Sequence, residues 1–234
     1  MTTPPPGKQA LIVGASRGLG LAMAAEYVTR GWQVTATVRG ARRTPLHDLA
    51  ESADGRLTVA QNVDITVPRQ IAALHEQVAG TAFDLLFVNA GTTNGDVPFT
   101  SVPTETFHHL METNALGPMR VVEAFHDVVT SAGTIGVMSS RQGSITLNTG
   151  AGYEVYRASK SALNQLMRCF AARHADDPRT LLLISPGWVR TELGGPGAPL
   201  AIEDSIPGVV DTITAHAGEG GLRFLDHRNQ TLPW

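Results

Sequence analysis

Short runs of branched aliphatic residues alternate along the chain with longer segments in which apolar residues recur every three or four positions. The short runs predict buried strands, and the longer segments predict amphipathic helices that connect them. This alternation is typical of a parallel sheet with crossover helices on both faces. The predicted strands cover residues 9–13, 33–38, 57–60, 83–88, 133–138, 180–184 and 221–225.

Three of the connecting segments carry one apolar face each, because their apolar residues recur at positions i, i+3, i+4 and i+7. Pro68 suits the first turn of a helix, where its missing N–H would have no partner, so we expect the first of these helices to begin there. The three faces consist of Ile71, Leu74, His75 and Val78; of Val121, Ala124, Phe125 and Val128; and of Leu163, Leu166, Met167 and Phe170.

The length and composition favour a single domain. Of the 234 residues, 42% are hydrophobic and 17% are charged, which leaves enough apolar side chains for one sizeable core. No internal repeat or change of composition marks a second domain. We therefore predict one Rossmann-type, doubly wound α/β domain over residues 1–234, with a mostly parallel seven-stranded sheet and helices on both faces. Residues 1–7 contain three consecutive prolines and are expected to form a flexible leader.

Charge and patterning argue against several classes of function. A net charge of −3 gives no broad positive surface, so we expect no binding to nucleic acid. No apolar run is long enough to cross a bilayer and no signal peptide is recognisable, which favours a cytoplasmic location without membrane contact. None of the eight histidines has the spacing of a metal site, so no metal is expected. Cys169, the single cysteine, lies in a helical stretch and is expected to be buried.

Three glycines, Gly14, Gly18 and Gly20, stand where the first predicted strand passes into a helix. Glycine lets the backbone turn tightly and approach a ligand closely, and the N–H groups and positive dipole end of the helix attract a phosphate. The pattern predicts a dinucleotide-binding turn, although the same glycines would also suit an ordinary strand-to-helix connection.

The end of the second strand indicates which dinucleotide binds. An acidic residue there would bind the ribose 2′-hydroxyl of NAD(H), but the sequence has Val38 followed by Arg39, and Arg17 stands in the glycine turn. Two cations could face a 2′-phosphate, which favours NADP(H) over NAD(H). Arg42 and Arg43 fit a solvated basic patch better.

Tyr156 and Lys160 lie four residues apart at the start of a strongly helical segment, so their side chains share one face. The ammonium is expected to lower the pKa of the phenol from its ordinary value of about 10, so that Tyr156 can donate or accept a proton. The same spacing is common by chance on helices, and a surface pair without a function is the alternative.

A serine hydroxyl is predicted at the carboxyl edge of the sheet, because Ser139 and Ser140 end the fifth strand. Ser140 could hydrogen-bond the carbonyl oxygen of a substrate, whereas serines also end strands as ordinary turn formers. Ser139 and Ser144 remain alternatives for this role.

Taken in order along the chain, these motifs resemble those of the short-chain dehydrogenase/reductase family, and the match runs from Lys8 to the end. The glycine turn resembles the family's cofactor motif, and Asn89-Ala90-Gly91 resembles its Asn-Ala-Gly motif after the fourth strand. Asp64 resembles the acid that contacts the adenine. Thr191, after a Pro-Gly pair, resembles the threonine that binds the nicotinamide carboxamide.

The resemblance also implies roles for individual residues. Asn114, Ser140, Tyr156 and Lys160 complete the family's catalytic tetrad, in which Asn114 holds a water of a proton relay. The implied cofactor contacts are Gly14, Ser16, Arg17, Gly18, Leu19, Gly20, Arg39, Asp64, Ile65, Asn89, Ala90, Gly91, Tyr156, Lys160, Pro186, Gly187, Val189 and Thr191.

Within the family, residues 156–164, Trp188 with the following Gly194-Gly195, and the ending Leu232-Pro233-Trp234 resemble the branch that contains C-factor and the Sniffer carbonyl reductases. The interval between Ser140 and Tyr156 is longer than is common in the wider family, and an insertion around residues 145–152 explains it. The family resemblance implies a homodimer or homotetramer, although this branch includes monomers.

The sequence therefore predicts an NADP(H)-dependent oxidoreductase that interconverts a ketone or aldehyde and an alcohol, with a small apolar or aromatic molecule as its substrate. A non-catalytic cofactor-sensing or signalling module on the same scaffold is the alternative, because a fold alone does not fix a function. Residues 194–199, which are rich in glycine and proline, predict a mobile flap over the site.

Overall fold

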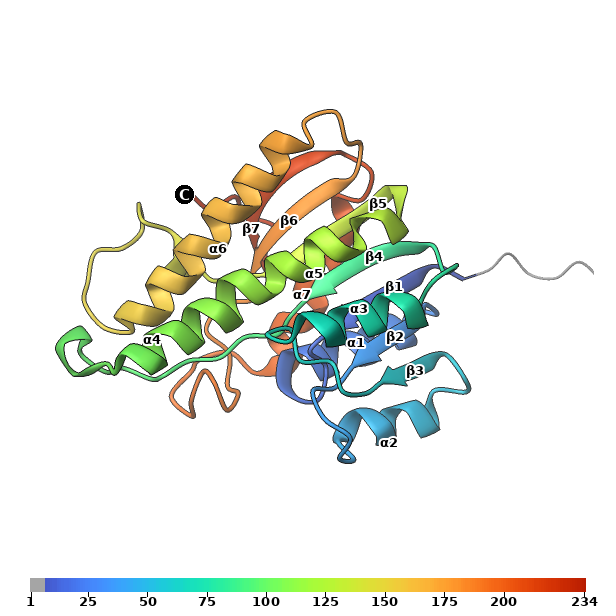
Figure 1. The fold of residues 1–234 in the computed structure, drawn as a ribbon, viewed down its shortest axis with the longest axis horizontal. Coiled ribbons are helices and arrows are strands. Elements are labelled where there is room, and N and C mark those ends of the chain that lie inside the picture. The colour runs from blue at the N-terminus through green and yellow to red at the C-terminus, as the bar shows by residue number, and fades with distance from the viewer. Residues whose placement is uncertain (1–6) are drawn as a thin grey trace, which may run out of the picture.

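One parallel sheet forms the centre of the molecule (Figure 1). The structure, a computed structural model, describes residues 7–234, and in this range seven strands pair in the order β3-β2-β1-β4-β5-β6-β7, every pair parallel. The strands are β1 Gln9–Val13, β2 Gln33–Thr37, β3 Leu57–Ala60, β4 Phe83–Val88, β5 Val129–Met138, β6 Thr180–Ser185 and β7 Gly221–Asp226. The predicted Rossmann-type sheet is therefore confirmed.

The helices follow the strands in the alternation that the sequence predicts. They are α1 Gly18–Thr29, α2 Pro45–Ser52, α3 Pro68–Gln77, α4 Thr104–Met111, α5 Gly117–Phe125, α6 Glu154–Arg173 and α7 Ile202–Ala215. A π-helical turn at Glu112–Leu116 joins α4 to α5, so the two run on as one long helix (Figure 1). Short 3₁₀ turns lie at Phe99–Ser101, His126–Val128 and Arg141–Gly143.

The sheet is buried on both faces. The central strand β4 shows the alternation, since Leu86 packs with the core beneath α3, α5 and α6, whereas Phe87 packs with the core beneath α1, α2 and α7. Figure 1 shows α3, α5 and α6 side by side across the near face. Burial of both faces explains why the strands are continuous hydrophobic runs rather than alternating ones.

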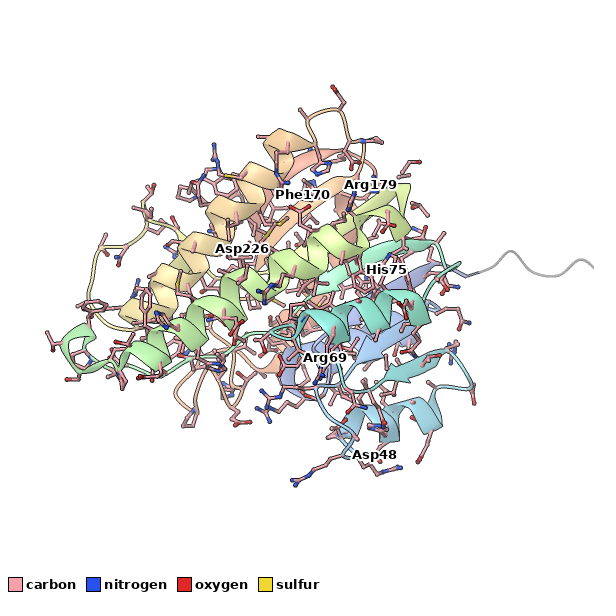
Figure 2. The ribbon with its side chains drawn as sticks, in the orientation of Figure 1. Asp48, Arg69, His75, Phe170, Arg179 and Asp226 are labelled. Atoms are coloured by element: carbon pink, nitrogen blue, oxygen red, sulfur yellow. The ribbon has the colours of Figure 1, made fainter. Side chains whose placement is uncertain are left out.

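The predicted helix faces are confirmed with one exception. α3 begins at Pro68, and Ile71 on it is buried. His75 lies on the same helix (Figure 2) and is partly buried, and its ring centroid is 5.3 Å from that of Phe125. Leu166 on α6, predicted to face the core, is 39% exposed, because it lies on the flank of the stripe that buried residues such as Phe170 form.

Three further expectations are corrected or limited by the structure. Cys169 is exposed rather than buried, because it lies about a third of a turn away from the buried stripe of α6. β5 begins at Val129 rather than at residue 133, because Val129 pairs with Phe83 of β4 before a register shift whose extra residues lie in β5. The predicted leader falls outside the described residues except for Gly7, and in the described range no helix is long and apolar enough to cross a membrane.

The topology fixes where a ligand would lie. The chain places β2 and β3 on one side of β1 and then crosses to β4, from which β5, β6 and β7 continue in the other direction. The connections after β1 and β4 therefore diverge, and a crevice forms at the carboxyl ends of these two strands.

Candidate active site

The glycine turn lies at this divergence, between β1 and α1. Gly14 and Gly18 have positive φ angles of 89° and 57°. A Cβ atom on Gly20 would lie 2.2 Å from the carbonyl oxygen of Gly14, so only glycine fits there. The backbone N–H of Gly14 donates to Oγ1 of Thr37 at the end of β2 (2.9 Å), which fixes the start of the turn.

The Asn-Ala-Gly segment after β4 supports the glycine turn. The Asn89 amide nitrogen donates to the carbonyl oxygen of Gly14 (2.8 Å), and the backbone N–H groups of Asn89 and Ala90 both donate to Val13. A Cβ on Gly91 would lie 3.4 Å from Oδ1 of Asn114 and 3.4 Å from Nζ of Lys160. The predicted cofactor and catalytic residues therefore converge at Gly91.

The two arginines predicted to face a phosphate have different surroundings. Arg39 is exposed just beyond β2. Arg17 is also exposed, but its Nε forms an ion pair with the carboxylate of Glu192 at 3.0 Å. Glu192 comes from the loop after β6, so this ion pair joins the glycine turn to the opposite wall of the crevice.

The segment after β3 carries the predicted adenine contacts. The side chain of Asp64 accepts hydrogen bonds from the backbone N–H and the hydroxyl of Thr66 (2.9 and 2.7 Å), which orders the turn before α3. Ile65 is buried against α5, where a Cβ on Gly117 would lie 2.9 Å from it. Asp64 is half-buried at the surface of the crevice.

The loop after β6 folds back on itself beside the glycine turn. Gly187 has a φ of 86°, and Val189 forms an isolated β-bridge with Leu200. Thr191 accepts a hydrogen bond from the backbone N–H of Gly194 (2.9 Å), and its Cγ2 would lie 3.9 Å from a Cβ on Gly18. Thr191, the predicted nicotinamide-binding threonine, is therefore adjacent to the glycine turn.

The predicted flap is attached at both of its ends. The indole nitrogen of Trp188 donates to the carbonyl oxygen of Gly194 (2.8 Å). The guanidinium of Arg190 donates to the carbonyl oxygens of Ala198 and Pro199 (3.0 and 2.9 Å). These contacts give residues 194–199 a defined path, and their mobility stays a prediction.

Tyr156 and Lys160 occupy the first turns of α6. The helix begins after Tyr153, whose φ of 52° is left-handed and whose backbone N–H donates to Asp96. Lys160 is 3% exposed, its Nζ lies 5.8 Å from the centroid of the Tyr156 ring, and it donates to the carbonyl oxygen of Met138 (2.9 Å). The two side chains thus share one face of α6 and point toward the end of β5.

The pKa values of this pair differ from the expectation that Lys160 brings the phenol toward neutral pH. Burial raises the pKa of Tyr156 to about 12, and the neighbouring Ser140 hydroxyl acts in the opposite direction. Burial also lowers the pKa of Lys160 to about 8. Loss of water is the largest cause for both groups. The phenol therefore stays protonated at neutral pH.

Of the three candidate serines, Ser140 is the one beside the phenol. The Ser139 hydroxyl is buried and donates to Oδ1 of Asn164, and the buried Ser144 hydroxyl accepts from the N–H of Leu147. Ser140 is half-exposed, and its oxygen accepts from the N–H of Gln142 (3.1 Å). Because that bond uses only a lone pair, the Ser140 O–H remains able to donate.

Asn114 lies fully buried in the π-helical turn, a feature that often marks functional sites. Its amide nitrogen donates to the carbonyl oxygen of Thr92 (2.8 Å) and to the hydroxyl of Ser159 (2.9 Å), and its Oδ1 accepts from the N–H of Thr92. The Asn114 amide group already donates both of its protons. A water could therefore bind to this residue only by donating a hydrogen bond to one of its oxygens. The side chain also links the loop after β4 to α6.

The structure adds residues that the motifs did not indicate. Thr37, Ser159, Asn164 and Glu192 each contact a predicted site residue or its neighbour through a side chain. Thr37 contacts Gly14 of the glycine turn, and Ser159 directly precedes Lys160 in the sequence. The ion pair between Arg17 and Glu192, by contrast, joins two residues that are far apart in the sequence. Local spacing carries no signal for such a contact.

A cavity of about 310 Å³ lies between residues 142–152 and α6. It contacts Glu154, Arg157 and Ser161 on α6, and neither Tyr156 nor Lys160 lines it. This cavity is therefore separate from the convergence of motifs at Gly91. Within residues 7–234, no three potential metal ligands gather in one place.

Comparison with known proteins agrees with these motifs. A family model described as short chain dehydrogenase matches residues 8–197. C-signal of Myxococcus xanthus is 34% identical over 158 residues, which are 64% of this chain and 92% of that protein. A short-chain dehydrogenase/reductase structure from Burkholderia multivorans with bound NADP is 55% identical, with a TM-score of 0.96 over 98% of this chain and 100% of that one.

A crystal structure of a carbonyl reductase from Pseudomonas aeruginosa PAO1 in complex with NADP is 39% identical, with a TM-score of 0.90 over 97% of this chain and 100% of that one. The family match covers most of the chain, and the structural matches extend over nearly all of it. The resemblance inferred from the motifs is confirmed. This chain belongs to the short-chain dehydrogenase family.

Proposed function

We propose that the protein is an NADP(H)-dependent oxidoreductase that interconverts a ketone or aldehyde and an alcohol, with Tyr156 as its general acid and base. The observation that carries this proposal is that Tyr156 and Lys160 share one face of α6, next to the segment that supports the glycine turn. A proton donor and a phosphate-binding turn thus lie in one crevice.

The residues of the crevice fit a dinucleotide. No side chain caps the start of α1 at Arg17, which leaves the backbone N–H groups of its first turn for a pyrophosphate. Thr191 and Asp64 would hold the nicotinamide and adenine ends. Arg39 would contact the 2′-phosphate, and the bound NADP in both solved relatives supports this choice of cofactor.

NADPH, when bound, supplies the hydride. Ser140 donates a hydrogen bond to the carbonyl oxygen of the substrate, which strengthens as negative charge develops there. Tyr156 donates its phenolic proton to the same oxygen, and its raised pKa keeps that proton in place at neutral pH. In the alcohol-oxidising direction, the same groups act in reverse.

Lys160 supports this proton transfer. With a pKa of about 8, its ammonium is largely charged at neutral pH and lies 5.8 Å from the phenol ring. The charge stabilises the phenolate that remains after the proton has left. We also expect the ammonium to bind the ribose hydroxyls of the nicotinamide half, since it lies 3.4 Å from the position of a Cβ on Gly91.

Cofactor choice is tested by fluorescence titration of the protein with NADPH and with NADH. We expect the wild type to bind NADPH more tightly than NADH. In Arg39→Ala, the ratio of the two Kd values should fall by about tenfold or more, because one charged contact with the 2′-phosphate is removed. Arg43→Ala is the matched control, since Arg43 is paired with Asp48 and Glu51. Failure of both cofactors to bind would overturn the proposal.

Turnover is tested by NADPH consumption with a panel of apolar ketones and aldehydes, including phenanthrenequinone. Reduction of any member supports the oxidoreductase. A cofactor-sensing module is the second candidate, because C-signal is among the relatives. Tight NADPH binding without turnover across the panel would favour that module instead.

A further inference from the structure

Ser140 lies in a short segment that has little regular structure of its own. It follows β5 directly and precedes the 3₁₀ turn Arg141–Gly143 and an irregular loop up to α6. The turn closes through the N–H of Gly143, which donates to the Ser140 carbonyl oxygen (2.8 Å). The position of the Ser140 hydroxyl therefore depends on what holds the residues on either side of it.

Asn164 on α6 contacts both sides of Ser140. It is 4% exposed, its Oδ1 accepts from the Ser139 hydroxyl (2.6 Å), and its Nδ2 donates to the carbonyl oxygen of Gly143 (3.2 Å). A carbonyl oxygen can only accept, so the amide nitrogen must face Gly143 and the amide oxygen must face Ser139. One side chain thus joins the residue before Ser140 to the end of the turn after it.

Further contacts show that this turn is packed against α6 closely. A Cβ on Gly143 would lie 3.0 Å from Nδ2 of Asn164 and from the backbone of Lys160. The Ser161 hydroxyl also donates to the Gly143 carbonyl oxygen (3.0 Å). Glycine at 143 lets the turn approach the helix near enough for Asn164 to reach both partners.

We propose that Asn164 is a positioning residue that fixes the distance between the Ser140 hydroxyl and the Tyr156 phenol. This inference rests on the proposed function, in which these two groups share one substrate oxygen. Asn164 lies two helical turns after Tyr156, so the helix that carries the proton donor also holds the serine turn. A displacement of about 1 Å at such a site lowers the rate strongly.

The first test measures amide hydrogen exchange in Asn164→Ala and requires no turnover. We expect the amides of Gln142, Gly143 and Ser144 to exchange at least about tenfold faster, because the turn loses its support, while those of β5 remain protected. Met167→Ala is the control, since it removes core volume from the same helix without a contact to the turn. Unchanged protection of the turn, or equal loss in the control, overturns the inference.

The second test is a double-mutant cycle between Asn164→Ala and Ser140→Ala, measured with NADPH and phenanthrenequinone. If Asn164 acts through Ser140, Asn164→Ala alone lowers kcat about tenfold with the KM for NADPH unchanged, and adds no further loss in the Ser140→Ala background. Additive losses would show that Asn164 acts elsewhere, and would overturn the inference.

The outcomes separate this inference from the function on which it rests. A wild-type protein without turnover, or Ser140→Ala with wild-type kcat, contradicts the proposed function or its serine. Hydrogen exchange then still decides whether Asn164 orders the turn. In Asn164→Asp, the side chain can donate to Gly143 only when protonated, so we expect its kcat relative to that of Asn164→Ala to rise toward acid pH, and a flat ratio would contradict the assigned contact.

Discussion

Tyr156 is kept in its protonated form by burial, which is the form needed to donate a proton to a developing alkoxide. Lys160 is buried beside it and loses part of its own tendency to be charged. Burial therefore acts on the phenol pKa in the opposite direction to a neighbouring ammonium. In the proposed reaction, the Lys160 charge would act mainly on the phenolate that remains after proton transfer.

Replacement of Tyr156 by phenylalanine tests this role. Tyr156→Phe should lower kcat by about a hundredfold to ten-thousandfold, because the proton donor is lost, while the Kd for NADPH changes little. Tyr153→Phe is the matched control, since the neighbouring Tyr153 contributes its backbone N–H at the start of α6. Stopped-flow turnover and fluorescence titration give the two quantities. A Tyr156→Phe protein with undiminished kcat would assign the proton transfer to another group.

The glycine turn makes an equally specific prediction. Gly20→Ala should abolish detectable NADPH binding, because the new Cβ would lie 2.2 Å from the Gly14 carbonyl oxygen and 2.6 Å from the Asn89 amide. Gly150→Ala, where no atom lies within 4 Å, should bind as the wild type does. Calorimetric titration of both variants checks this, and normal binding by Gly20→Ala would show that the turn does not cradle the cofactor.

Residues within local motifs could be predicted from the sequence, and residues that act through the fold could not. Tyr156 and Lys160 are four positions apart on one helix, so their spacing alone brings them together. Asn164 reaches its partners only because Gly143 lets the turn approach α6. Which of the adjacent serines faces the phenol also depends on how β5 ends, and the sequence left that choice open.

At the scale of elements, the alternation predicted the order and type of the seven strands, and periodicity predicted the helices α3, α5 and α6. The residues at which these elements begin and end depend also on packing, which periodicity does not indicate. β5 extends back to Val129 because an irregularity in β5, between Val129 and Thr134, lets Val129 pair with Phe83 of β4. The π-helical turn at Glu112–Leu116 is followed directly by Gly117-Pro118, and the Gly117 N–H donates to the carbonyl oxygen of Glu112. Pro118 has no N–H with which to continue the regular helical pattern, so this turn has a local cause that periodicity alone does not show.

The ion pair between Arg17 and Glu192 connects two elements on opposite sides of the crevice, and it competes with any phosphate for Arg17. Glu192→Gln should therefore tighten NADPH binding, by up to about fivefold, since exposed ion pairs contribute about 0.2–1 kcal/mol. The gain should shrink at high salt. Glu105→Gln, an equal charge change on α4, is the control in the same titration. Weaker binding in Glu192→Gln would mean that the pair closes the crevice instead.

At the scale of the whole molecule, the sheet order brings loops from six strands to one edge, so residues from 14 to 191 meet in one crevice. Burying Lys160 in this arrangement has a cost for stability. The ordinary lysine pKa of 10.5 is lowered to about 8 in the folded protein. Below pH 8, Lys160 is protonated in both the folded and the unfolded chain, so the full cost of burying a charged ammonium is present.

Between pH 8 and pH 10 the unfolded chain keeps this proton while the folded protein loses it, so stability should rise with pH. Relative to Lys160→Met, the free energy of unfolding of the wild type should increase by about 2 kcal/mol over this range. Tyr156, with its pKa of about 12, begins to contribute only at higher pH. Denaturant unfolding at several pH values checks this, and parallel curves for the two proteins would exclude a buried, neutralised lysine.

The central claim, hydride transfer assisted by Tyr156, is tested most directly with NADPH deuterated at C4 of the nicotinamide. Incubated with the protein and a simple aromatic aldehyde or ketone that it reduces, this cofactor, deuterated on both faces of C4, should place deuterium on the new carbinol carbon, as mass spectrometry of the alcohol would show. Tyr156→Phe should form almost none of this product. Bound NADPH without deuterium transfer to any carbonyl substrate would contradict the account and leave a protein that binds its cofactor without using it.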